Sequence, residues 1–361
     1  MRIGADGLKF PVAGQGALAI LRSAREAGLD GVFFRTTLEM SPTLDRGELR
    51  EIRAEADQLG LYLEGGLGKV NPYSSAEAPP LRAIGDGDIA LGCRRVIEAS
   101  ADIGCRELWV GLANKKGQYR GMLAYDRFRT DVTWQDQLQA TERFLRELAP
   151  IARAAGVHLN IETHEEITSF EVVRLVEAIG PDVIGVVFDS SNGLQRMEHP
   201  NAAAARVAPF VRQTHLKDAF LAESEDGLRY QVRPCGQGVI DFGAVIEVLV
   251  RHNPDITLTI ENRPPDDSSA ISMHPTIVQW QEPLFRDSHP DLTQDEIQSV
   301  LELVRVGRER VASGAIEDAE SYDSKPYGVK DAFEVLRTSR NYLRTVVGLG
   351  AARSGGISHD D

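Results

Sequence analysis

Four residues that can bind a metal ion stand at the ends of four strand-like runs in the second half of the chain. Glu162, Asp189, His215 and Glu261 each come just where such a run stops. Three carboxylates and one imidazole suit Mn²⁺, Mg²⁺ or Co²⁺ better than structural zinc, which favours thiolates and imidazoles. A lone carboxylate after a strand is more often a helix cap or a solvated loop residue. Four such residues in succession predict a site for one divalent ion, and Mn²⁺ fits it best because it tolerates the imidazole.

Two further residues lie two positions beyond a proposed ligand. His164 follows Glu162, and Lys217 follows His215. Residues i and i+2 of an extended chain share a face, so both side chains are expected in the same cavity. A neutral imidazole titrates near pH 7 and is a natural base, whereas a lysine can hold a substrate oxygen. The structural alternatives are a loop histidine bonded to the barrel and a salt bridge from Lys217 to a rim carboxylate such as Asp218.

Arg35 and Trp109 come near the ends of the second and fourth predicted strands. Both are candidates for lining a substrate pocket. Trp109 also suits the core, because large aromatic side chains dominate protein interiors.

Short strand-like runs alternate along the chain with longer amphipathic stretches that suit helices. The eight predicted strands cover residues 2–5, 31–36, 61–64, 107–111, 157–162, 183–189, 211–215 and 256–261. Helices are predicted between them at 17–27, 48–59, 88–103, 134–155, 169–179, 201–207 and 242–252. Eight alternating units over roughly 260 residues predict a closed (β/α)8 TIM barrel. An open doubly wound sheet is the alternative, but residues 4–16 lack its G-x-G-x-x-G loop.

Several segments stand outside this alternation. They comprise long loops at 71–87 and 264–290, a hairpin at 221–238 with its turn at 225–227, and helices near 294–310 and 330–347. We expect one domain over residues 1–361, with a core barrel at about 1–262, a long strand-eight loop and C-terminal helical extension at about 263–350, and a disordered tail at 351–361. Long loops in a compact domain often serve as lids.

Composition narrows the class of protein. The formal net charge of −14 argues against a nucleic-acid substrate, which usually requires a basic face. The start of the chain lacks a signal-peptide apolar region, and no apolar run is long enough to span a membrane, so a cytoplasmic location is expected. Cys93, Cys105 and Cys235 are widely spaced and odd in number, which favours buried thiols over disulfides.

The segments around the four candidate ligands resemble the xylose isomerase-like (sugar phosphate isomerase/epimerase) superfamily. These segments read Asn-Ile-Glu-Thr-His, Val-Val-Phe-Asp-Ser, Thr-His-Leu-Lys-Asp and Thr-Ile-Glu-Asn, and Gly-Gln-Gly-Val-Ile-Asp-Phe at 236–242 is similar to a turn of that group. In the alternation of strands and helices, the resemblance covers residues 1–262. In the sequence motifs, it covers residues 157–262. It implies a TIM barrel with one divalent ion held by Glu, Asp, His and Glu. Members isomerise, epimerise or dehydrate polyols, and a related branch cleaves abasic DNA.

Departures from the family patterns narrow the choice of activity. Ketose 3-epimerases carry a Glu where this chain has Thr168 and a His where it has Asn192. The DNA-repair branch needs a three-zinc cluster with more His ligands. Asn192 and the acidic charge speak against that branch.

Within the superfamily, the chain resembles the larger (alpha) subunit of bacterial C-glycoside deglycosidases. The features that carry this resemblance are Glu-Thr-His-Glu-Glu at 162–166, Lys217, the long strand-eight loop and the C-terminal helices. The resemblance implies a 3-oxo-glycoside substrate. It also implies a small beta subunit and therefore a hetero-oligomer.

The residues predict a consistent mechanism for such a substrate. A ketone at C3 makes the C2 proton acidic once a divalent ion chelates the oxygens at C2 and C3 and stabilises an enediolate. His164 would take the C2 proton, and β-elimination would then expel the C1 aglycone. A divalent-metal-dependent sugar or keto-polyol isomerase or epimerase is the alternative, because it uses the same enediolate chemistry. A non-catalytic barrel with a structural ion is a third reading, but four protein ligands leave open positions on a six-coordinate ion.

Overall fold

A computed structural model of the chain describes residues 1–74, 78–113, 115–116, 118–262 and 275–354. Eight parallel strands form its main sheet in the order β10-β1-β2-β3-β4-β5-β6-β7. They are β1 (Ile3–Asp6), β2 (Gly31–Phe33), β3 (Tyr62–Lys69), β4 (Glu107–Gly111), β5 (His158–Glu162), β6 (Ile184–Asp189), β7 (Val211–His215) and β10 (Leu258–Ile260). A parallel bridge between Leu216 and Ile260 joins the two ends of the sheet. The predicted TIM barrel is confirmed.

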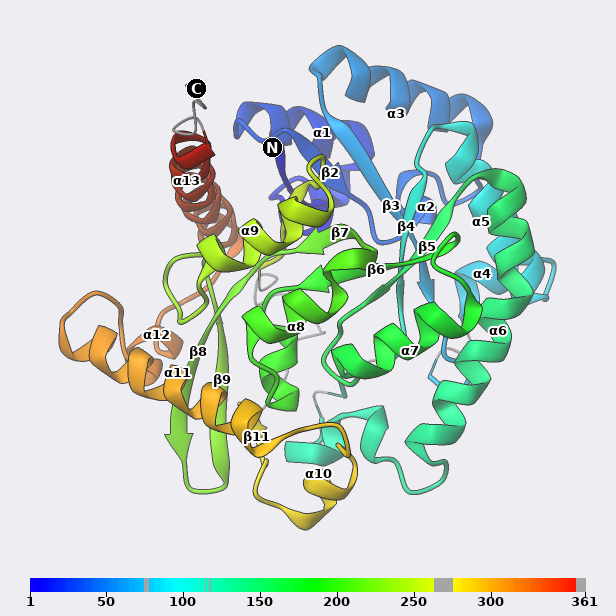
Figure 1. Cartoon of the computed structure of the whole chain (residues 1–361). Coiled ribbons are helices and arrows are strands. Elements are labelled where there is room, and N and C mark those ends of the chain that lie inside the picture. Colours follow the sequence, from blue (N-terminus) through cyan, green and yellow to red (C-terminus); the bar gives the residue numbers. More distant parts are fainter. Residues whose placement is uncertain (75–77, 114, 117, 263–274, 355–361) are drawn as a thin grey trace, which may run out of the picture.

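Helices surround this barrel (Figure 1). Those of the barrel are α1 (Ala17–Glu26), α2 (Thr37–Met40), α3 (Arg46–Leu59), α4 (Pro79–Ile84), α5 (Ile89–Asp102), α6 (Trp134–Ala155), α7 (Ser169–Ile179), α8 (Pro200–Val207) and α9 (Phe242–His252). Local signals set many of their ends. Thr168 begins α7 with a capping box that includes Glu171, and Gly156 ends α6 in a left-handed conformation with φ 64°.

A second, antiparallel sheet lies beside the barrel. It has the order β11-β9-β8, with β8 (Asp218–Ser224), β9 (Gly227–Arg233) and β11 (Thr276–Val278). The β8–β9 hairpin turns at 225–226, which confirms the hairpin predicted from the Glu-Asp-Gly turn. Helices α10 (Pro283–Asp287), α11 (Gln294–Ala312), α12 (Ala319–Asp323) and α13 (Val329–Ser354) complete the C-terminal part.

Some predicted segments were wrong in detail. The loop expected at 71–87 contains α4, which begins at a Pro-Pro pair suited to a first helical turn. The irregular loop expected at 264–290 contains β11 and α10 in its described part, while residues 263–274 lie outside the described residues. Strand β11 pairs with β9, a partner distant in sequence, so no local pattern could reveal it. Strand β3 runs to Lys69, five residues beyond the predicted end, because a bulge at Gly66–Gly68 carries its pairing with β4 onward.

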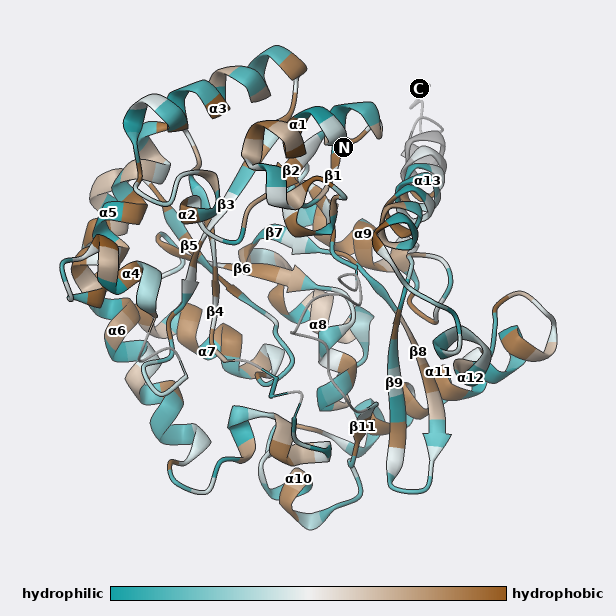
Figure 2. Cartoon of the chain, turned by 180° about the vertical axis from the view of Figure 1, so that it is seen from behind, coloured by the Kyte–Doolittle hydropathy of each residue, from teal (hydrophilic) through white to brown (hydrophobic). Residues whose placement is uncertain are grey.

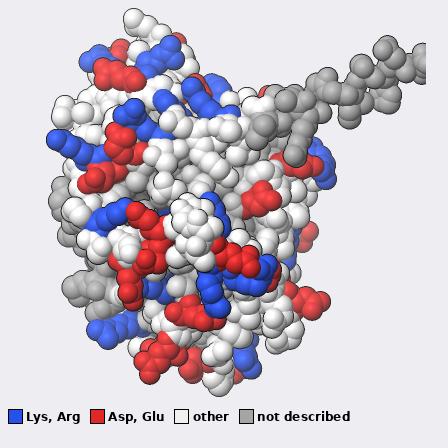
Figure 3. Space-filling model, turned by 90° about the vertical axis from the view of Figure 1, so that its left-hand side faces the viewer, with Lys and Arg blue, Asp and Glu red and all other residues white. Residues whose placement is uncertain are grey.

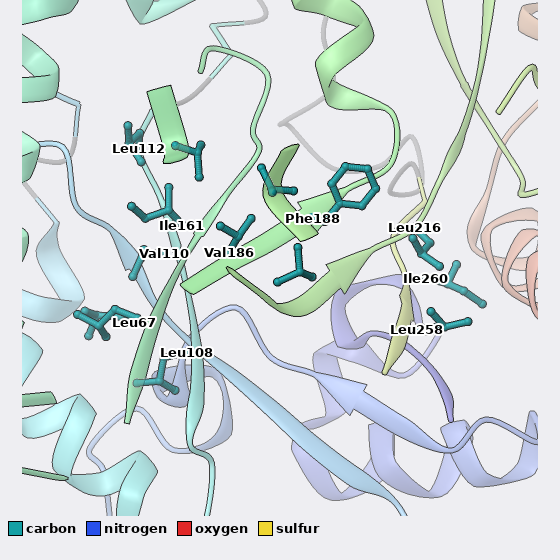
Figure 4. Packing of buried hydrophobic residues seen from close by; sticks show 14 of the residues in the cluster. Leu67, Leu108, Val110, Leu112, Ile161, Val186, Phe188, Leu216, Leu258 and Ile260 are labelled. Atoms are coloured by element: carbon teal, nitrogen blue, oxygen red, sulfur yellow. The ribbon is translucent and has the colours of Figure 1, made fainter. Parts of the chain in front are cut away.

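The hydrophobic core joins the barrel strands to the inner faces of the helices. Side chains of the strands and of the residues beside them pack closely, as Figure 4 shows for Leu108, Val110, Ile161, Val186 and Phe188. Figure 2 shows hydrophobic strands at the centre and helices that present both hydrophobic and hydrophilic residues. This core holds the strands rigidly, and it therefore holds the residues at their carboxyl ends in place.

The distribution of surface charges, the character of the helices and the state of the cysteines can be compared with what the composition predicted. Acidic and basic side chains are interspersed on the face drawn in Figure 3. No helix in the described part of the chain has the length and apolar character needed to cross a membrane. All three cysteines are buried and free, as predicted.

Candidate metal centre

Four potential ligands converge at the carboxyl end of the barrel. Glu162, Asp189 and His215 are the last residues of β5, β6 and β7, and Glu261 directly follows β10. Each residue offers one ligand atom, and these four atoms all lie within 4.8 Å of one another. Parallel strands deliver their carboxyl ends to one face, which is why a spacing of up to 99 sequence positions collapses into one cluster.

Neighbouring groups hold two of the carboxylates in place. The indole Nε1 of Trp109 donates a 2.7 Å hydrogen bond to Oε2 of Glu162. Oδ1 of Asp189 accepts from the backbone N–H groups of Ser191 at 2.9 Å and Asn192 at 2.8 Å. In each case one oxygen is engaged and the other is directed to the cluster, which is the arrangement that supporting residues give to metal ligands.

His215 provides the test of whether these residues fit a metal ion. Its Nδ1 lies 3.2 Å from Oε1 of Glu162, while its buried Nε2 has no hydrogen-bond partner. Its ring is packed against the ring of Phe33, with centroids 4.7 Å apart. Burial opposes protonation, but Glu162, Glu261 and Asp189 together outweigh it and raise the pKa of His215. An imidazole ring whose Nδ1 lies beside a carboxylate and whose buried Nε2 is unpartnered fits a divalent cation.

Two cationic side chains bind carboxylate oxygens of the cluster. The Lys217 ammonium contacts both Asp189 and Glu261. Arg35 donates to Oε1 of Glu261 at 3.0 Å and to Oδ2 of Asp6 at 2.8 Å. Although burial disfavours its charge, Lys217, His215 and Arg35 together lower the pKa of Glu261 well below its usual value. Burial raises the pKa of Asp189 to about 6, with Lys217 acting in the opposite direction.

His164 has a carboxylate partner that the sequence did not reveal. Its Nδ1 lies 2.5 Å from Oε2 of Glu166, whose other oxygen accepts the backbone N–H of Ala113 at 2.9 Å. Burial disfavours the imidazolium, but Glu166 and Glu162 together outweigh burial and raise the pKa of His164 to about 9. The ring is therefore mostly protonated at neutral pH in the metal-free protein. This differs from the neutral imidazole assumed from the sequence.

The remaining sequence candidates lie at the cluster. Trp109 and Arg35, interpreted from the sequence as lining a sugar pocket, each donate to a ligand carboxylate. Sequence reasoning missed Asp6, which ends β1 and is fully buried against Arg35 and Lys9. The strand-end pattern that singled out the ligands applies to Asp6 as well, and it could have identified this residue.

The residues at which the chain departs from the ketose 3-epimerase pattern have structural partners. Thr168 is the N-cap of α7 and does not belong to the cluster. Asn192 lies at the edge of the cluster, with its Nδ2 3.4 Å from Oε1 of Glu162.

A family model described as a xylose isomerase-like TIM barrel matches residues 21–280. The chain belongs to this family. The resemblance inferred from the four ligand segments is therefore confirmed at the level of the superfamily.

Two curated relatives match parts of the chain. The uncharacterized protein YihM of Escherichia coli (strain K12) is 27% identical over 204 residues, covering 56% of this chain and 62% of that protein. The 3-oxo-isoapionate decarboxylase of Pectobacterium atrosepticum is 26% identical over 128 residues, covering 35% of this chain and 46% of that enzyme. The matches thus span less than two thirds of either relative.

Solved structures share the fold at low sequence identity. A structure of L-ribulose 3-epimerase superposes with a TM-score of 0.60 at 18% identity, covering 100% of this chain and 99% of the other. The 3-keto-D-glucoside 4-epimerase YcjR of E. coli gives a TM-score of 0.53 at 17% identity, covering 80% of this chain and 98% of the other. At these identities the similarity concerns the fold.

Proposed function

We propose that the chain is a divalent-metal-dependent lyase that cleaves a 3-oxo-glycoside by removal of the C2 proton and β-elimination of the C1 aglycone. The observation that carries this proposal is the convergence of Glu162, Asp189, His215 and Glu261, with ligand atoms within 4.8 Å of one another. Such a cluster at the carboxyl end of a TIM barrel lies where active sites of this fold are found.

The donor set favours one ion of the hard or borderline class. Mn²⁺ fits best, and Mg²⁺ and Co²⁺ are the alternatives. When bound, such an ion would act as a Lewis acid toward two adjacent substrate oxygens and so make the neighbouring C–H group more acidic.

The protein's own residues supply orientation and proton transfer. His164 is the proposed base for the C2 proton. Glu162 contributes to the raised pKa of its ring, so a cation bound at Glu162 would lower that pKa and favour the neutral form, in which Nδ1–H donates to Glu166 and Nε2 is left to accept. In the metal-free protein Lys217 contacts two of the proposed ligand carboxylates. When an ion is bound to these carboxylates, Lys217 is proposed to bind a substrate oxygen or the negative charge that develops on it. Trp109 and Arg35 each donate a hydrogen bond to a proposed ligand carboxylate. We propose that they also form one wall of the sugar pocket.

The partial relative named 3-oxo-isoapionate decarboxylase supports the lyase class. By its name it removes a carboxyl group from a 3-oxo sugar acid, a carbon–carbon cleavage next to the same kind of ketone. A sugar or keto-polyol isomerase or epimerase is the second candidate, favoured by the superposition with L-ribulose 3-epimerase along the whole chain. Thr168 and Asn192 at two positions of the ketose 3-epimerase pattern weigh against it.

The domain organisation, the substrate and the partner subunit are proposed from the resemblance to C-glycoside deglycosidases. We propose a single domain whose barrel ends near residue 262, a sugar or glycoside as substrate, and a small beta subunit in a hetero-oligomer. A cytoplasmic site of action is consistent with the sequence.

A direct assay separates the candidates. The protein loaded with Mn²⁺ would be incubated in parallel with a 3-oxo-glycoside and, in D₂O, with a free ketose. Released aglycone supports the lyase, whereas deuterium at C3 of the ketose without cleavage supports the epimerase. Glu162→Gln should abolish either activity by removing a ligand. If the purified protein takes up none of Mn²⁺, Mg²⁺ and Co²⁺, the proposal is wrong.

A further inference from the structure

Lys69 stands at the end of the longest barrel strand, beside the metal cluster. Strand β3 has eight residues against six or fewer in the other barrel strands, and its bulge brings Lys69 opposite Gly111 of β4. A Cβ at Gly111 would approach the Lys69 Nζ to 2.9 Å and the Trp109 ring to 2.9 Å. The glycine therefore leaves room for the lysine to lie against the tryptophan.

The contacts of Lys69 connect it to the candidate site from two sides. Its Nζ lies 5.4 Å from the centroid of the Trp109 ring, whose Nε1 donates to Glu162. Its Nζ also donates to the carbonyl of Ala113, and the N–H of the same residue binds Glu166, the partner of His164. Lys69 is thus connected to the cluster through Trp109 and to the proposed base through Ala113 and Glu166.

Lys69 differs from the other cations around the cluster because its ammonium forms no ion pair with a carboxylate of the described chain. Lys217 contacts Asp189 and Glu261, and Arg35 contacts Asp6 and Glu261. No carboxylate oxygen of the described chain lies within 4.0 Å of the Lys69 ammonium, which is half-buried. An ammonium has three N–H donors, and only one of them is used, by Ala113.

The charge balance of the metal-bound site also indicates that Lys69 can accept an anionic group. With a divalent ion bound, the ion and Lys217 together match the three carboxylates of the cluster. The positive charge of Lys69 helps to lower the pKa of Glu166, but the oxygens of Glu166 are engaged by His164 and by the backbone N–H of Ala113 and form no ion pair with the ammonium. A half-buried charge favours a counter-ion, and the free N–H groups of Lys69 are where one would bind.

We propose that Lys69 binds a carboxylate of the substrate, so that the substrate class is a sugar acid rather than a neutral sugar. This inference rests on the proposed function, because it places the carboxylate beside the same cluster. The role is one of specificity: the ammonium contacts the substrate, while Trp109 and Ala113 hold the ammonium in position.

Binding measurements on the full chain loaded with one equivalent of Mn²⁺ test this proposal. The probes are D-gluconate, D-galactonate and D-glucuronate, each compared with its neutral counterpart D-glucitol, D-galactitol or D-glucose by isothermal titration calorimetry. We expect at least one acid to bind at least about tenfold more tightly than its counterpart. Lys69→Met, which keeps the apolar stem against Trp109, should remove that difference. Lys330→Met makes the same chemical change at an exposed position of α13 and should keep it.

Each outcome decides the proposal. If no acid binds more tightly than its counterpart, undetectable binding included, Lys69 has no such role. If Lys69→Met keeps the preference, the carboxylate binds the metal alone, and the proposal is again wrong. Mn²⁺ affinity and near-UV circular dichroism of the variant exclude a general loss of structure. Binding of acids that depends on Lys69, without catalysis, would disprove the proposed reaction and leave this inference standing. Cleavage of a neutral 3-oxo-glycoside, without a preference for acids, would support the proposed reaction and disprove the role of Lys69.

Discussion

The barrel buries carboxylates in its interior and at its carboxyl end, but it surrounds them with different partners. Glu64, inside the barrel, accepts hydrogen bonds from the hydroxyls of Thr257 and Thr259, and Tyr62 lies 3.1 Å from the second hydroxyl. Burial raises the pKa of Glu64, and the two hydroxyls only partly oppose this rise. The interior carboxyl is therefore satisfied by neutral groups.

Glu162 is also buried, yet its pKa shifts in the opposite direction. Burial again favours the neutral acid, but His164 and His215 outweigh it and lower the pKa of Glu162. The carboxyl-end cluster also leaves Nε2 of His215 without a partner. The comparison teaches that burial alone does not mark a functional carboxylate. What distinguishes the two sites is whether neighbouring strands supply neutral hydroxyls or further ligands and cations.

The sharpest way to break this comparison is to make the same substitution at both sites. Glu162→Gln should weaken Mn²⁺ binding by more than about 100-fold, because loss of a ligand should exceed the 10- to 100-fold effect of losing a supporting residue. Glu64→Gln is the matched control and should leave Mn²⁺ affinity unchanged. Calorimetric titration of both variants measures this. Equal affinities would mean that the cluster does not bind the ion.

Trp109→Phe should weaken Mn²⁺ binding by about tenfold, at the lower end of the range for groups that orient ligands. The variant removes the N–H that holds Glu162 but keeps an aromatic ring against Phe33. Electron paramagnetic resonance of free Mn²⁺ during titration gives the affinity. Unchanged affinity would show that the backbone of β5 positions Glu162 without help.

Lys217→Met should act in the other direction and tighten Mn²⁺ binding by about tenfold, or about 1.4 kcal/mol. The ammonium contacts carboxylate oxygens of Asp189 and Glu261 that the ion needs, and like charges repel. The same titration applies. Weaker binding would indicate instead that Lys217 holds these carboxylates in the geometry that the ion requires.

The smallest effect is expected for the stability of Glu64→Gln. The free energy of unfolding should change by no more than about 1 kcal/mol, because the raised pKa already favours a neutral group and threonine hydroxyls can either donate or accept. Urea denaturation of the metal-free protein measures this change. A loss above about 3 kcal/mol would show that the interior carboxyl needs its charge.

Much of the barrel and its ligands could be predicted from local patterns. Alternating strands and helices follow from hydrophobic period and from caps such as Thr168 and Gly156, which act within a few residues. The four candidate ligands were recognisable because a polar residue at a strand end has a fixed location once parallel strands close into a barrel. The expectation that residues at the carboxyl ends of parallel strands converge requires no knowledge of side-chain contacts.

What the sequence by itself determined was therefore the barrel and the types of candidate metal ligand at its carboxyl end. The tertiary structure decided which neighbours these residues meet: Trp109 bonds Glu162 from 53 positions away, and Lys69 reaches Ala113 from 44. It also decided the charge state of His164, through the orientation of Glu166. Hydrophobic period and capping act over a few residues, whereas hydrogen bonds and pKa values depend on which strands lie side by side and on what burial removes from water.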